Sequence, residues 1–269
     1  MGSDGRLTVD LNVDCGEGFG IYPSGDDDAL FRWVSSANIA CGFHAGDPRT
    51  MRRTVRLAMK HGVAIGAHPG LPDLAGFGRR EMALTPEEAA DITLYQIGAL
   101  EAFVKAEGGM LSHVKPHGAL YTMLARDRLH SDAVALAIQR LDPDLILYGF
   151  AGGESIAAAE SAGLRAASEA FADRTYSPDG SLAARHLPDA VITDPDRMAR
   201  RAVDLATTGS TLDAGPAAAI RVDTLCIHGD CKAPAGAAQA IYERLAAHGI
   251  AVEPLCRQVK ASPQLDRRC

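Results

Sequence analysis

The chain has 269 residues, of which 47% are hydrophobic and 23% are charged, so it can bury a full core as one large α/β domain. Its net charge of −7 and its scattered arginines and lysines argue against nucleic-acid binding, because phosphate backbones require a basic face. No apolar run approaches the roughly 18 residues that a membrane span needs. We expect one domain over residues 1–269, with loose termini at 1–6 and 257–269. The six cysteines include no Cys-x-x-Cys pair, which favours a protein of the reducing cytoplasm.

The first predicted strand covers residues 7–13, where β-favouring side chains alternate, and it ends at a glycine-rich loop. This loop carries the carboxylates of Asp14 and Glu17. Its glycines lack the later glycine of a dinucleotide fingerprint, and no clear helix follows at once. We therefore interpret them as glycines that allow a tight turn around two acidic side chains.

The second and third predicted strands are each followed by a histidine. A glycine separates the second strand, residues 35–41, from His44 and Asp47. Asp47 precedes a proline, and apolar residues then recur at helical spacing, so Asp47 is predicted to be a helix N-cap. The third strand, residues 63–67, runs directly into His68.

The loop after the third strand is rich in glycine and ends in Arg79 and Arg80. Two arginines suit an anionic ligand if both face the same mouth. Thr85 and Glu88 then match a capping box, which predicts a long helix that ends near residue 106.

Four more apolar runs predict strands, and residues 250–254 could form an eighth. The four runs are residues 110–114, 145–148, 164–167 and 224–227. Polar side chains again follow three of them, namely Lys115, His117 and Tyr121, then Glu169 and Arg174, then His228 and Asp230. The region 176–219 is the least regular, and only a helix near 195–206 is predicted there.

Strands that alternate with helices predict a parallel sheet with right-handed crossovers, either doubly wound or closed into a barrel. In a doubly wound sheet, only the loops near the switch point build a site. Here polar residues follow nearly every strand, as expected when all strands end at one mouth. We therefore predict an α/β protein with a distorted (β/α) barrel of about seven parallel strands.

Several kinds of chemistry can be weighed from these residues. Asp14, His44 and His68 form a reasonable ligand set for a divalent metal, although no His-x-His or His-x-x-x-His spacing links the strand-end residues. His113 lies within the fourth strand and is expected to make a structural hydrogen bond. The chain lacks both the common phosphate-binding loop and the Gly-x-Ser-x-Gly elbow of serine hydrolases.

Long motifs in the chain resemble the LamB/YcsF family, whose members are known as the A component of 5-oxoprolinase. The motifs are residues 10–17, 38–47, 66–69, 76–80, 114–121, 169–174 and 228–230. The resemblance spans residues from about 8 to 254. Val13 and Gly70 stand where we expect cysteine and serine in this family, and neither departure touches an ionisable group.

The resemblance implies a barrel similar to the glycoside hydrolase and deacetylase superfamily. It also implies a reaction, the ATP-dependent opening of the lactam of 5-oxo-L-proline to L-glutamate, with ADP and phosphate as the other products. Two partner subunits, B and C, would complete the enzyme, and they and Mg²⁺ would help to hold ATP. Opening an unstrained lactam needs its amide oxygen activated, most simply by phosphorylation, before water attacks.

We expect Asp14, Glu17 or His44 to act as the base, while Lys115 and His117 stabilise developing charge and protonate the departing nitrogen. The remaining polar residues are expected to bind substrate: Asn12, Asp47, His68, Arg79, Arg80, Tyr121, Glu169, Arg174, His228 and Asp230. Two alternatives stay open, a metal-dependent deacetylase-like hydrolase that acts alone and a non-catalytic lactam-binding component. The need for a catalytic metal also stays open.

Overall fold

The structure is a computed structural model that describes residues 6–177, 180–184, 186–209, 219–228 and 234–256. Its strands are β1 (Thr8–Cys15), β2 (Ser36–Ala40), β3 (Ala64–His68), β4 (Leu111–Val114), β5 (Ile146–Phe150), β6 (Arg165–Phe171), β7 (Thr224–Ile227) and β8 (Ala251–Val252). Each strand overlaps one that the sequence predicts. The largest difference is β6, which continues to Phe171 rather than stopping at residue 167.

Seven parallel strands close into a barrel, which confirms the predicted fold. Neighbouring strands follow the chain from β2 to β7, and β1 pairs with both β2 and β7 to close the ring. β8 adds a short parallel pairing of Ala251 and Val252 with Thr8 and Val9 of β1. The carboxyl ends of all seven strands therefore meet at one end of the barrel, which we call the mouth, and the opposite end is the base.

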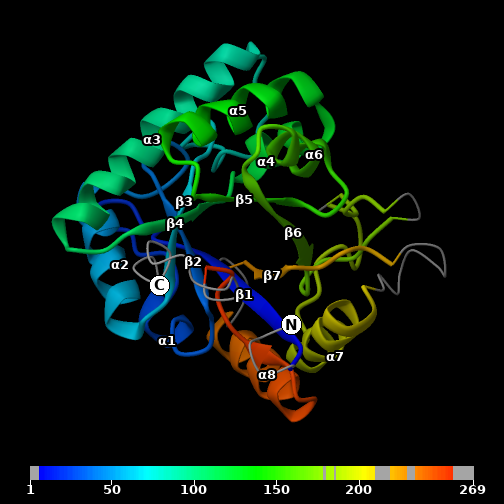
Figure 1. The fold of residues 1–269 in the computed structure, drawn as a ribbon. Coiled ribbons are helices and arrows are strands. Elements are labelled where there is room, and N and C mark those ends of the chain that lie inside the picture. The colour runs from blue at the N-terminus through cyan, green and yellow to red at the C-terminus, as the bar shows by residue number, and fades with distance from the viewer. Residues whose placement is uncertain (1–5, 178–179, 185, 210–218, 229–233, 257–269) are drawn as a thin grey trace.

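Helices cover the outside of the barrel (Figure 1). They are α1 (Asp27–Leu30), α2 (Pro48–His61), α3 (Pro86–Ala106), α4 (Gly118–Arg126), α5 (Arg128–Leu141), α6 (Glu154–Ser161), α7 (Pro195–Thr208) and α8 (Pro234–Ala247). Figure 1 shows α3 to α6 on one side of the strands and α7 with α8 on the other. Among the described residues, none of these helices combines the length and apolarity needed to cross a bilayer.

Two predicted helix starts are confirmed. Thr85 and Glu88 form the reciprocal capping box of α3, and the Asp47 side chain accepts the first free backbone N–H groups of α2. Asp47 also accepts a hydrogen bond from the backbone of Gly20 at 2.9 Å, which ties the loop after β1 to α2. Burial would raise the pKa of Asp47, but the hydrogen bonds from Gly20 and Thr50 lower it to about 2.

Alternate residues of β1 face opposite sides of the barrel wall. Leu11 and Val13 belong to the apolar core between strands and helices. Asp10, Asn12 and Asp14 are buried on the other side and form hydrogen bonds with side chains from other strands. The interior of the barrel is therefore polar from its base, at Asp10, to its mouth, at Asp14.

The base of the barrel is organised around Asp10. Its Oδ1 accepts hydrogen bonds from Ser35 at 2.6 Å and Ser36 at 2.7 Å, and its Oδ2 accepts from Tyr148 at 3.0 Å and Thr224 at 2.6 Å. Burial raises the pKa of Asp10, although these hydroxyl donors oppose the shift. Both carboxylate oxygens thus have two donors each, supplied by the loop before β2 and by strands β2, β5 and β7.

Candidate functional site

Lys115 follows β4 directly and lies at the centre of the mouth. Its Nζ is 2.9 Å from Asp14 Oδ1, 3.0 Å from Glu169 Oε1 and 2.9 Å from Cys226 Sγ. Burial alone would lower the pKa of Lys115, but Asp14, Cys226 and Glu169 raise it well above its usual value. The lysine is therefore a fixed positive charge that is shielded from solvent.

Asp14 joins Lys115 to His68. Its Oδ1 accepts hydrogen bonds from Lys115 and from the Asn38 amide, both at 2.9 Å, and its Oδ2 lies 3.3 Å from His68 Nε2. Burial would raise the pKa of Asp14, but His68 and Lys115 hold it well below its usual range. Asp14 is therefore ionised at neutral pH, and it is a weak proton acceptor.

Two backbone carbonyls orient His68 and His117. His68 Nδ1 lies 2.7 Å from the carbonyl oxygen of Lys115, and His117 Nε2 lies 2.8 Å from that of Phe77. Because a carbonyl oxygen can only accept, each of these nitrogens carries the hydrogen. The other two nitrogens, His68 Nε2 and His117 Nδ1, face each other at 2.9 Å. In their neutral forms the two rings therefore present lone pairs to one another.

His44 lies in the loop after β2 and stacks on His117, with ring centroids 3.8 Å apart and planes that differ by 6°. Neither ring nitrogen of His44 has a hydrogen-bond partner in the described part of the chain, and its Nε2 lies 3.5 Å from Glu17 Oε1. Burial lowers the pKa of His44 well below its usual value, and His68 adds to the shift. A Cβ atom at Gly70 would lie 2.6 Å from His44 Nδ1, so the glycine leaves room for this ring.

Glu169 and Asn12 contact Lys115 from inside the barrel. Glu169 was expected in the loop after the sixth strand, and this placement is wrong, because β6 continues past it and its side chain is fully buried. No glycine or proline interrupts residues 165–171, so nothing ends the strand earlier. Asn12 donates a hydrogen bond to Glu169 Oε1 at 2.9 Å and accepts one from Lys115 at 3.1 Å.

Tyr121 and His228 pack on the same aromatic ring, that of Phe171. Tyr121 meets it edge-on at 5.9 Å, and His228 stacks on it at 5.6 Å. His228 Nδ1 also lies 2.7 Å from Asp173 Oδ2. These predicted residues are therefore brought together on the β6 and β7 side of the barrel, whereas Asp230 lies outside the described residues.

The three arginines predicted to bind substrate, Arg79, Arg80 and Arg174, have different surroundings. The Arg80 Nε donates to Asp73 Oδ2 at 2.9 Å, and Arg174 is buried and donates to two backbone carbonyls. Arg79 is exposed, with its guanidinium 5.0 Å from the centre of the Phe77 ring. Because the Phe77 carbonyl accepts a hydrogen bond from a histidine of the mouth, Arg79 adjoins the mouth.

Two groups of potential metal ligands lie at the mouth, and the donor atoms within each group are less than 4.8 Å apart. The groups are Glu17 with His44, His68 and His117, and Asp14 with Cys226 and His228. The predicted set of Asp14, His44 and His68 is divided between them. In the second group, Lys115 already contacts Asp14 and Cys226 and supplies the positive charge that a cation would bring.

Sequence reasoning missed two residues of the site, Cys226 and Asn38. Cys226 contacts the lysine of the mouth, and Asn38 Oδ1 lies 2.9 Å from His113 Nε2, which confirms the structural hydrogen bond expected of His113. The available signal was the period of two in a strand, since Cys226 lies two residues before His228 and shares its side of the strand.

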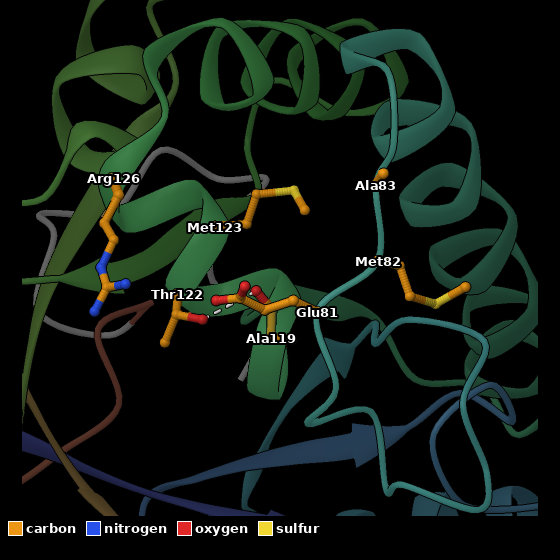
Figure 2. Close-up of a pocket in the computed structure, with 7 residues that line it drawn as sticks. All are labelled: Glu81, Met82, Ala83, Ala119, Thr122, Met123 and Arg126. Carbon is orange, nitrogen blue, oxygen red and sulfur yellow. Dashed lines mark hydrogen bonds between the residues drawn. The ribbon is translucent and has the colours of Figure 1, made fainter. Parts of the chain in front are cut away.

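A separate surface pocket of about 390 Å³ lies beside α4 (Figure 2). It is lined by Glu81, Met82, Ala83, Ala119, Thr122, Met123 and Arg126. Figure 2 shows the Glu81 side chain directed toward Thr122. None of the predicted site residues lines this pocket, so the buried polar cluster at the mouth is the candidate active site.

Comparison with known proteins agrees with the motifs. The family model of the LamB/YcsF family matches residues 9–260. The A component of 5-oxoprolinase from Bacillus subtilis is 51% identical over 251 residues, which cover 93% of this chain and 98% of that protein. The corresponding 5-oxoprolinase component from Brevibacillus brevis is 52% identical over 246 residues, which cover 91% and 97%.

A solved structure extends this similarity to three dimensions. The crystal structure of a lactam utilization protein from Thermus thermophilus has a TM-score of 0.86 to this structure at 51% sequence identity. The match covers 92% of this chain and 99% of that one. Sequence and structure therefore agree over nearly the whole length, and the chain belongs to the LamB/YcsF family.

Proposed function

We propose that this chain is one subunit of an ATP-dependent 5-oxoprolinase, which opens the lactam of 5-oxo-L-proline to L-glutamate and releases ADP and phosphate. The observation that carries the proposal is the identity of about half of the positions, over 91% and 93% of the chain, to two proteins described as 5-oxoprolinase subunits. A protein described as one subunit implies partners. We propose that two of them, the B and C components, complete the enzyme and, with Mg²⁺, help to hold ATP.

The fixed charge of Lys115 suits an activated lactam. Phosphorylation of the amide oxygen and attack by water both place negative charge beside the reacting carbon. The Lys115 ammonium is held by four acceptors before any substrate arrives, so it needs little reorganisation to stabilise that charge. Asp14, which is ionised at neutral pH, serves in this proposal as its fixed counter-charge.

His44 is the proposed general base. Burial lowers its pKa, so the ring is neutral at neutral pH and its unpartnered nitrogens can accept a proton from water, although this burial also makes it a weaker base than free imidazole. Glu17, at 3.5 Å, would stabilise the imidazolium that forms. The same imidazolium can then return the proton to the departing lactam nitrogen.

Reconstitution with the partner subunits tests this proposal. Glutamate and phosphate are measured from 5-oxoproline, ATP and Mg²⁺ with and without this chain, and we expect both products to require it. His44→Gln is expected to lower kcat by about 100-fold or more, because it removes the base. His248→Gln is the matched control, since His248 is exposed just after α8, and it should behave as the wild type. Equal glutamate formation without the chain would exclude the proposal.

A second candidate function is capture of the lactam while the partners perform all chemistry. It is favoured by the absence of a common phosphate-binding loop in the sequence. Calorimetric titration of the chain with 5-oxoproline and then with ATP separates the two functions. Lactam binding together with full turnover by His44→Gln would favour capture.

A further inference from the structure

The ring nitrogens of His68 and His117 that face each other lie only 2.9 Å apart. The outer nitrogen of each ring donates its hydrogen to a backbone carbonyl, so in the neutral rings the two facing nitrogens both carry lone pairs. Lone pairs at this distance repel one another. The two side chains are 1% and 4% exposed, so this contact lies in the buried part of the mouth.

Two carboxylates add negative charge around the same contact. Asp14 Oδ2 lies 3.3 Å from His68 Nε2, and Glu17 Oε1 lies 3.9 Å from His117 Nδ1. Lys115 contacts Asp14 through the other oxygen, Oδ1. One carboxylate oxygen therefore adjoins each of the two facing nitrogens, and a cation in the volume between these nitrogens would be attracted by both carboxylates.

We propose that this volume binds one divalent transition-metal ion through His68 Nε2, His117 Nδ1 and Glu17 Oε1. Donors that each lie about 2.1 Å from one ion are at most about 4.2 Å apart, and the distances of 2.9 and 3.9 Å satisfy this limit. Two imidazoles and one carboxylate suit zinc and its neighbours in the first transition row. The carbonyls of Lys115 and Phe77 hold the outer ring nitrogens, as expected for metal-binding histidines.

His44 is left out of the ligand set. Because its ring is parallel to that of His117, the in-plane lone pairs of the two rings do not converge on one ion. Its place beside Glu17 suits it instead to accept a proton from a water on an open position of the ion. Three protein ligands and an open position are typical of catalytic metal sites. This catalytic role rests on the proposed function, whereas metal binding itself does not.

Metal binding is tested on the chain by itself, without partner subunits or turnover. The chain is first dialysed against a chelator. Binding of Co²⁺ is then measured in a titration through the visible absorption of the bound ion. Binding of Zn²⁺ is measured separately by equilibrium dialysis and elemental analysis. We expect one equivalent of either ion. Glu17→Gln and His117→Ala should weaken binding by about tenfold or more, while His44→Gln should stay within about threefold of the wild type.

Circular dichroism and thermal melting of the metal-free variants check that each one folds. No measurable uptake of Co²⁺ or Zn²⁺ by the folded wild type would overturn the proposal, as would equal binding by the wild type and both ligand variants. Nitrogen-15 spectra that show an imidazolium at His68 or His117 would then assign the short contact to a shared proton. Glutamate formation without metal binding would leave the proposed function intact, so the two proposals can fail separately.

Discussion

The base and the mouth of the barrel are both polar and buried, but they differ in how completely their polar groups are paired. At the base, four hydroxyl groups donate to Asp10 and satisfy both of its oxygens. At the mouth, the His44 ring has no hydrogen-bond partner in the described chain, and ring nitrogens of His68 and His117 face each other at 2.9 Å. Fully paired buried groups stabilise one structure, whereas groups left unpaired within the chain can bind a water, an ion or a substrate, or take part in catalysis. The difference favours a structural role for the base and supports the mouth as the candidate active site.

The largest expected effect comes from Lys115→Met, which removes the positive charge of the mouth. Asp14 and Glu169 would then be buried without their shared cation, so the free energy of unfolding should fall by about 3–5 kcal/mol. Turnover by the reconstituted enzyme should fall by about 1,000-fold. Urea denaturation and the glutamate assay measure the two effects.

Lys105→Met is the matched control, because Lys105 is 69% exposed on α3 and pairs with Glu101 only at the surface. Its effect on unfolding should stay within about 1 kcal/mol. If Lys115→Met were as stable and as active as this control, the ion pairs of Lys115 would contribute no more than an ordinary surface ion pair.

The fold could be predicted because apolar runs, helix starts and strand-end polar residues repeat along the chain. The closed barrel is distinguished from an open sheet by polar residues that follow different strands, namely His44, His68, Lys115 and His228. The structure confirms the closed barrel, and it also confirms the helix starts at Asp47 and Thr85. These features depend on local sequence and on connection rules, which a single chain displays directly.

The polar interior could not be predicted in the same way. Asp10 and Asn38 alternate with apolar residues in their strands, as solvent-facing residues commonly do, so the sequence cannot show that they point inward. Their roles depend on partners more than 20 residues away, such as Thr224 for Asp10 and His113 for Asn38. Only the barrel register brings these partners together.

The next effect concerns the base, where Asp10→Ala should leave four buried hydroxyls without their acceptor. We expect a loss of about 2–4 kcal/mol in the free energy of unfolding, with kcat within about twofold of the wild type. Urea denaturation and the glutamate assay again provide the measurements. Loss of turnover in a variant that still folds would contradict the separation of base and mouth.

Asp10→Asn sharpens this prediction through its pH dependence. Burial raises the pKa of Asp10 above the unfolded value of 3.8, so its contribution to stability is full below that value and is lost as pH rises through the folded pKa. The amide does not titrate, and rotating hydroxyls can both donate to it and accept from it. We therefore expect Asp10→Asn to be at least as stable as the wild type at pH 7 and relatively less stable at pH 4. If the difference in the free energy of unfolding between the two proteins does not change with pH, burial does not shift the pKa of the Asp10 carboxyl.

The smallest expected effect concerns Arg79, which is exposed and adjoins the mouth. A guanidinium binds a carboxylate through two parallel hydrogen bonds, and an ammonium cannot reproduce this contact. If Arg79 anchors the carboxylate of 5-oxoproline, Arg79→Lys should raise KM by about tenfold, with little change in melting temperature. Arg174→Lys is the opposite control, because Arg174 is buried against backbone carbonyls and its replacement should lower stability before it changes KM. An unchanged KM in Arg79→Lys would show that another group of the mouth binds the carboxylate, and Lys115 would be the next cation to test. A crystal soaked with 5-oxoproline would identify that group.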